Sequence, residues 1–91
     1  MNDVAEQVEV EMPRYVSHKK VWALELRSAD LTANDEGILT FTENGYAPLK
    51  VPGVMFVRYK PVPGDFFVQY EDGYKSFSPR KAFIEGYKRE T

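Results

Sequence analysis

Residues 66–77 carry the pattern that most limits what this chain of 91 residues can fold into. Aromatic and β-branched residues fill both arms of the segment, and the dipeptide Asp72-Gly73 lies between them. Asp-Gly is a strong signal for a two-residue hairpin turn, because such turns need positive φ angles that glycine adopts without strain. The pattern therefore predicts a β-hairpin with these cross-strand pairs: Glu71 with Tyr74, Tyr70 with Lys75, and Val68 with Phe77.

Alternating apolar residues predict three more strands. Residues 20–28 place apolar side chains on one face, and residues 38–42 are β-branched and aromatic enough for a second strand. The dipeptide Asn44-Gly45 predicts a tight turn after that strand. Residues 46–51 predict the return strand, which must be short or at an edge because Pro48 cannot donate a ladder hydrogen bond.

Two short helices complete the expected fold. Pro52 suits the first turn of a helix over residues 53–60, although the apolar run there would also suit a buried strand. At the second helix, Ser78 suits the N-cap, Pro79 the first helical position and Gly86 the C-terminal end. Both helices are thus expected from their boundary residues.

These elements predict a single α+β domain, because a chain of 91 residues supports one hydrophobic core. The expected architecture is a small antiparallel sheet of four to five strands with two short helices. The alternative is a small SH3-like β-barrel. Seven residues are expected to form the core: Trp22, Leu24, Leu26, Phe41, Val68, Phe77 and Phe83.

Residues 1–12 differ from the rest of the chain, because they carry four acids and no base. Val8, Val10 and Met12 alternate with acids, a pattern that fits either an added edge strand or an acidic N-terminal tail, and we favour the tail. The compact domain is expected over residues 13–91, which carry twelve bases and ten acids. That balance disfavours a general nucleic-acid binder, which usually presents a strongly basic face.

The residue inventory restricts the chemistry of the chain. There is no cysteine and a single histidine, His18, so the sequence offers no thiolate nucleophile and no zinc-binding cluster. We therefore expect a protein that is not an enzyme and carries no cofactor and no metal. No apolar run approaches the ~20 residues of a membrane span, and no signal peptide is recognisable, so we expect no membrane partner.

The candidate binding residues lie in the hairpin and the second helix. The predicted register turns Phe67 and Tyr74 away from the core, unless a barrel-like closure buries both faces. Arg80 and Lys81 place two cations at a helix N-terminus, with Lys75 close in sequence. Exposed amides and cations there would suit an anion, whereas the alternative is a solvated basic face. A secondary interface candidate is the apolar segment with Val54, Met55, Phe56 and Tyr59.

Residues 64–79 read GDFFVQYEDGYKSFSP and are followed by Ala82-Phe83 and by residues 85–87, which read EGY. This pattern resembles a family of small, uncharacterised bacteriophage and prophage proteins. The resemblance extends over most of residues 12–88 and implies a phage origin. This chain departs from the family at Arg80-Lys81, and over residues 53–60, which are more apolar here.

The resemblance, together with the lack of catalytic residues, suggests a non-enzymatic phage accessory protein. The main hypothesis is a protein that binds and inhibits a host protein in the host cytoplasm, such as a component of antiviral defence. One alternative is a binder that sequesters a nucleotide-like anionic ligand, and another is a nucleic-acid or virion-assembly module. A homodimer is left open.

A chain that starts at Met12 is expected to fold like the full chain, because residues 1–12 have a net charge of −4 and few large apolar groups. Its melting temperature, measured by circular dichroism, should lie within a few degrees of the value for the full chain. A loss of cooperative unfolding would show instead that Val8 and Val10 belong to the sheet.

Overall fold

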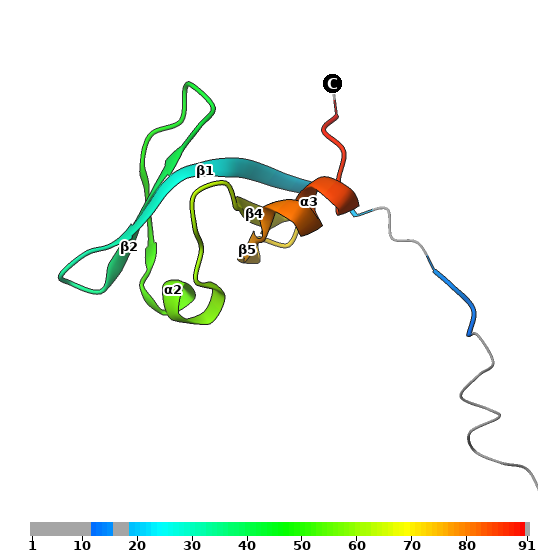
Figure 1. Ribbon diagram of the computed structural model, residues 1–91, viewed down its shortest axis with the longest axis horizontal. Coiled ribbons are helices and arrows are strands. Elements are labelled where there is room, and N and C mark those ends of the chain that lie inside the picture. Colours follow the sequence, from blue (N-terminus) through cyan, green and yellow to red (C-terminus); the bar gives the residue numbers. More distant parts are fainter. Residues whose placement is uncertain (1–11, 16–18, 91) are drawn as a thin grey trace, which may run out of the picture.

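The computed structural model describes residues 12–15 and 19–90 (Figure 1). The acidic segment, apart from Met12, and the single histidine lie outside the described residues. The elements follow in the order β1 Val21–Leu31, β2 Glu36–Phe41, β3 Leu49–Pro52, α2 Val54–Tyr59, β4 Phe66–Tyr70, β5 Lys75–Ser78 and α3 Arg80–Gly86. No helix within the described ranges has the length and apolar character needed to cross a membrane.

The strands form one five-stranded antiparallel sheet in the order β3-β2-β1-β4-β5. The long strand β1 pairs with β4 through its first half and with β2 through its second half. The register shifts between Leu26 and Ser28, and such a bulge bends a strand and increases its twist. The sheet therefore curls into a half-barrel that stays open between β3 and β5, and with two short helices it confirms the α+β prediction.

The five strands form a partly open barrel, with a helix between the third and fourth strands. The SH3-like alternative expects a closed sheet. Here β3 and β5 occupy the two ends of the strand order, and α2 contacts both of them. A short helix therefore contacts both edge strands, which are not joined to one another by ladder hydrogen bonds.

The core fills the inner face of this half-barrel. Its buried cluster consists of Leu26, Leu39, Phe41, Val51, Phe67 and Phe77. From α2, the ring of Phe56 meets Phe77 edge-on at 6.1 Å between centroids, and the ring of Tyr59 does so at 5.9 Å. Helix α2 is thus the second layer that keeps water from the inner face.

The hairpin register differs from the predicted one by one residue. Phe67 pairs with Phe77 and Gln69 with Lys75, and the amide of Tyr70 donates to the carbonyl of Tyr74 at 2.8 Å. The loop therefore spans three residues, 71–73, and ends with Gly73 at a φ of 91°. A type I turn followed by a left-handed glycine is a common three-residue hairpin. The predicted pairs were wrong, and the observed register places Phe67 and Phe77 together on the inner face.

Three members of the predicted core lie outside this cluster. Val68 is buried, but it pairs with Ser76 on the face of β4 opposite to Phe67. Trp22 is 62% exposed, because it pairs with Gln69 near the end of β4, beyond the buried cluster on the same face. Phe83 packs on the outer face, where its ring stacks on Phe66 at 4.1 Å between centroids, and Tyr87 stacks on Phe83 at 4.8 Å. The outer face thus carries a small aromatic stack of its own beneath α3.

Several predicted boundaries also need correction. Helix α2 lies within the expected range 53–60, but Asn44-Gly45 does not form a two-residue turn, because β2 and β3 are separated by residues 42–48. Ser78 is not the N-cap of α3, since it ends β5 and its hydroxyl donates to the carbonyl of Pro79 at 3.4 Å. The structure places the carboxylate of Asp65 at that helix end instead.

Replacement of Gly37 by Ala is expected to destabilise the domain by about 1–3 kcal/mol, because a side chain there would overlap the ring of Phe56. The free energy of unfolding can be measured by urea titration. Gly86→Ala is the matched control, since no atom lies within 4 Å of the added methyl group. Equal free energies of unfolding for the two variants would show that α2 does not pack on β2 as described.

Candidate functional site

One hollow of the molecule lies at the open seam between β3 and β5. We define the seam by the residues that line it: Leu49, Lys50, Val51, Pro52, Met55, Gly73, Tyr74 and Lys75. Its volume is about 490 Å³, within the range of pockets that hold ligands. Because both strands are edge strands, the backbone groups along their outer sides are open to pairing with another chain.

The seam combines apolar walls with positive charge. Leu49 is 37% exposed and Tyr74 is 50% exposed, so both offer apolar surface to a partner. Lys50 and Lys75 supply the charge, and the ammonium group of Lys75 donates to the carbonyl of Gly73 at 3.4 Å. No acidic residue is among those that line the seam. The arrangement suits an extended ligand with apolar and acidic side chains.

Tyr74 stands at the centre of this region. Its hydroxyl group lies 2.9 Å from that of Tyr59, and its ring centroid lies 5.7 Å from that of Tyr70. The hydrogen bond to Tyr74 is the main cause that raises the pKa of Tyr59 above its ordinary value. Tyr74 also borders a second hollow of about 460 Å³, lined on its other sides by Lys19, Lys20, Tyr70, Glu71 and Asp72. The phenol is thus held in place between two hollows.

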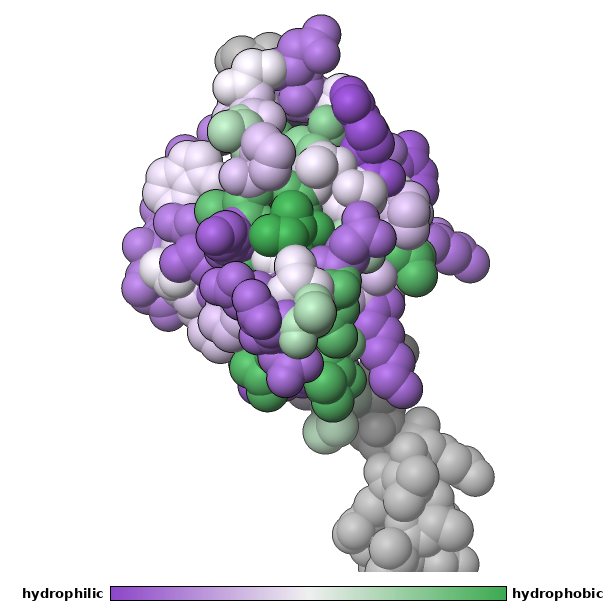
Figure 2. Space-filling view, turned by 90° about the vertical axis from the view of Figure 1, so that its left-hand side faces the viewer, coloured by the Kyte–Doolittle hydropathy of each residue, from purple (hydrophilic) through white to green (hydrophobic). Residues whose placement is uncertain are grey.

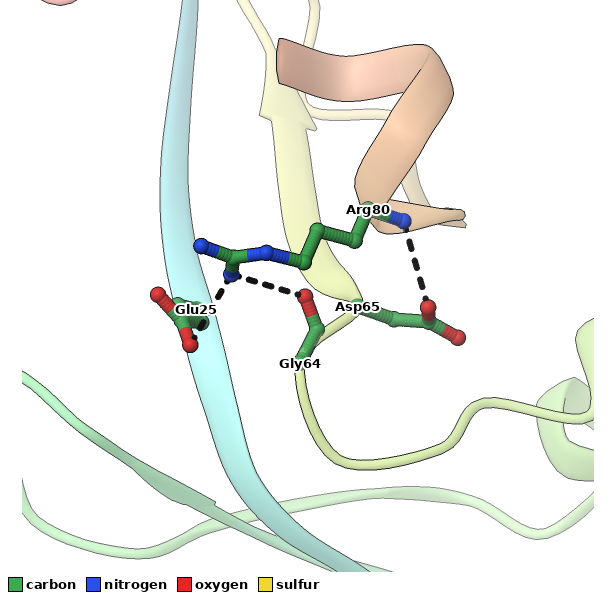
Figure 3. Close-up of polar contacts among 4 residues, drawn as sticks. All are labelled: Glu25, Gly64, Asp65 and Arg80. Atoms are coloured by element: carbon green, nitrogen blue, oxygen red, sulfur yellow. Dashed lines mark hydrogen bonds and ion pairs between the residues drawn. The ribbon is translucent and has the colours of Figure 1, made fainter.

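Arg80, a predicted anion ligand, is engaged within the chain (Figure 3). Its guanidinium group lies 3.0 Å from the carboxylate of Glu25 and donates to the carbonyl of Gly64 at 3.4 Å. Its backbone amide donates to the carboxylate of Asp65 at 3.3 Å. The same carboxylate accepts the amide of Val62 at 3.0 Å. An acidic side chain of the protein therefore occupies the helix end where an external anion was expected.

The structure separates the five predicted binding residues. Tyr74 and Lys75 share the seam, whereas Arg80 lies on the other side of the sheet with α3, and Lys81 is exposed on that helix. The expectation that Phe67 is exposed was wrong, because the shifted register buries it against Phe77 at 5.8 Å between ring centroids. Phe67 is therefore not available to a partner.

The secondary candidate segment is also divided. Met55 lines the seam and Val54 is 69% exposed, whereas Phe56 and Tyr59 turn toward the core. Val57, which sequence reasoning did not single out, is 71% exposed and lies one helical turn from Val54. Figure 2 shows the side of the molecule where β2 and α2 lie, with apolar side chains gathered in its centre and lower part among hydrophilic ones. The helical spacing of the two valines was the signal that could have revealed this surface.

Two loops and the acidic side chains bear on whether the chain could bind nucleic acid or a metal ion. The loop between β1 and β2 carries Asp35, and the loop between β4 and β5 carries Glu71 and Asp72. These carboxylates would repel phosphates. Within the described ranges, no three histidine, aspartate or glutamate side chains gather closely enough to hold a metal ion.

Among known proteins, the comparisons show a likeness of fold. No family model and no curated protein matches the chain. Among solved structures, the monomeric form of the phage L decoration protein, determined in solution by NMR, is similar with a TM-score of 0.60 over 77% of this chain, at 18% sequence identity. The chain spans about half (52%) of the length of that protein. The fold is therefore one that a phage protein uses.

Asp65→Ala is expected to lower the free energy of unfolding by about 1 kcal/mol, as the loss of a helix cap does. The carboxylate of Asp65 joins the loop before β4 to the first amide of α3, and alanine keeps neither hydrogen bond. Glu85→Ala on the exposed side of the same helix should stay within about 0.5 kcal/mol of the parent. Thermal unfolding of both variants measures the difference, and an unchanged Asp65→Ala variant would refute the capping role.

Proposed function

We propose that this chain is a phage virion module that attaches to the outside of an assembled capsid. The observation that carries the proposal is the likeness of fold to the phage L decoration protein over 77% of the chain. A module that attaches to a capsid needs a docking surface for another protein. The half-barrel with exposed apolar residues on α2 supplies such a surface.

The described surface supports docking to a protein more than binding of a small ligand. Val54 and Val57 present apolar side chains on the outer side of α2, and exposed apolar patches bordered by polar residues mark protein interfaces. Arg58 on the same helix lies over the ring of Tyr59 at 5.4 Å. Arginine and exposed apolar groups together are typical of interface surfaces. We therefore assign capsid contact to this face of α2.

The same face of α2 could also bind a soluble host protein. The two hypotheses therefore differ in where the chain is found, on the virion or free in the host cell. The likeness of fold favours the virion, because it connects the domain with a decoration protein and offers no link to a host target. The engaged guanidinium of Arg80 weakens the case for a nucleotide-like ligand, and the acidic loops weaken the case for nucleic acid.

The test uses virions of the phage or prophage that carries the gene. Particles purified on a density gradient should contain the chain in a fixed ratio to the major capsid protein, measured by mass spectrometry. Purified chain added to particles made without the gene should sediment with them. Absence from the particles, together with capture of a soluble host protein, would replace the virion reading with the inhibitor reading.

Val57→Asp is expected to reduce cosedimentation with the particles by roughly tenfold or more, since a buried unpaired charge at an interface is costly. Ile84→Asp is the matched control, because Ile84 is also exposed, at 55%, but lies on α3. Both variants should keep the parent melting temperature. Equal losses, or none, would remove the face of α2 from the contact with the capsid.

A further inference from the structure

The second hollow that Tyr74 borders lies between the residues that lead into β1 and the loop of the β4–β5 hairpin. Its volume is about 460 Å³, within the range of pockets that hold ligands. The described residues that line it are Lys19, Lys20, Tyr70, Glu71, Asp72 and Tyr74. None of them belongs to α2, so capsid contact through Val54 and Val57 would not use these groups. In Figure 1 the start of β1 lies to the right, away from α2 and β2.

Two tyrosines supply the apolar part of this hollow. The ring centroids of Tyr70 and Tyr74 lie 5.7 Å apart, and Tyr74 is 50% exposed. The hydroxyl group of Tyr74 lies 2.9 Å from that of Tyr59, and its backbone amide donates to the carboxylate of Asp72 at 2.9 Å. The exposed ring is therefore fixed from two sides, and its face can receive the C–H groups of a ligand without rearrangement.

The charged groups around the rings disfavour a charged ligand. The carboxylates of Glu71 and Asp72 border the hollow and would repel an anion. The ammonium group of Lys19 lies 5.5 Å from the centroid of the Tyr70 ring, so a cation of the chain itself occupies the cation–π position on that ring. The hollow therefore suits an uncharged ligand whose groups both donate and accept hydrogen bonds.

We propose that this hollow binds an uncharged sugar unit, either free or as part of a polysaccharide. A hexose ring has a face of C–H groups, which can pack on the exposed ring of Tyr74. Its hydroxyl groups can donate to the carboxylates of Glu71 and Asp72 and accept from the ammonium group of Lys19. The proposal goes beyond capsid attachment, because it concerns a different surface and a different class of ligand.

The test titrates the isotope-labelled full chain with the methyl glycosides of glucose, galactose, mannose and N-acetylglucosamine, followed by NMR. At least one of them is expected to bind, and the largest shifts should fall on the amide signals of residues 19–20 and 70–74. Galacturonate and glucosamine should bind roughly tenfold more weakly than galactose and N-acetylglucosamine, their uncharged counterparts. Maltohexaose and chitohexaose distinguish the two sources, because only a polysaccharide ligand predicts tighter binding of the chain than of the single ring.

Matched variants separate the ring from the polar groups. Tyr74→Ala should weaken sugar binding by roughly tenfold, whereas Tyr74→Phe should stay within about twofold of the wild type, because it keeps the ring and loses only the hydroxyl group. Glu71→Ala should also weaken binding by roughly tenfold, since it removes a charged acceptor. Glu85→Ala, on the exposed side of α3, is the control and should bind like the wild type. Circular dichroism verifies that each variant is folded.

Three results would overturn the proposal: no binding of any of these uncharged sugars, tighter binding of galacturonate or glucosamine than of the uncharged counterpart, or a folded Tyr74→Ala variant that binds like the wild type. The measurements need no virions, so they are independent of the test of capsid attachment. A chain that sediments with particles and binds no sugar would refute only the sugar site.

Discussion

The long strand β1 is the constraint on which the rest of the structure depends. It pairs with β4 through its first half and with β2 through its second half, and the register shift between Leu26 and Ser28 lies between the two. Because the bulge bends the strand, the two halves of the sheet turn toward one another. The curl brings the far edges, β3 and β5, to opposite sides of one seam. In this arrangement α2 contacts both edge strands.

The two helices pack on opposite faces of this open sheet. Helix α2 covers the inner face, where Phe56 and Tyr59 meet Phe77 and complete the core. Helix α3 belongs to the outer face, where Phe83 stacks on Phe66 and the Arg80 guanidinium reaches Glu25 of β1. The groups at the N-terminus of α3 are therefore used to hold the domain together. The surfaces left for partners are the outer side of α2 and the seam.

The hairpin illustrates how far sequence patterns reach. Aromatic alternation and Asp72-Gly73 correctly placed two strands and a glycine with positive φ, because turn chemistry is local. They did not decide between a loop of two residues and one of three. That choice depends on whether Phe77 faces Phe67 or Val68, and contacts with β2 and α2 settle it. A shift of one residue moved Phe67 from the expected surface into the core.

The candidate site likewise combines features that the sequence predicts with features that only tertiary contacts decide. The sequence by itself predicted the α+β class, because strand and turn patterns are local. For residues 53–60 it left a short helix and a buried strand both open, and the structure shows a helix at residues 54–59. The apolar and basic side chains of Met55, Tyr74 and Lys75 are given by the sequence. Only the tertiary structure decided that residues 49–52 and 73–75 form one seam, and that Asp65 and Glu25 engage Arg80. The physical reason is that these contacts join residues far apart in the chain. They exist only once the bent β1 has set the curl of the sheet.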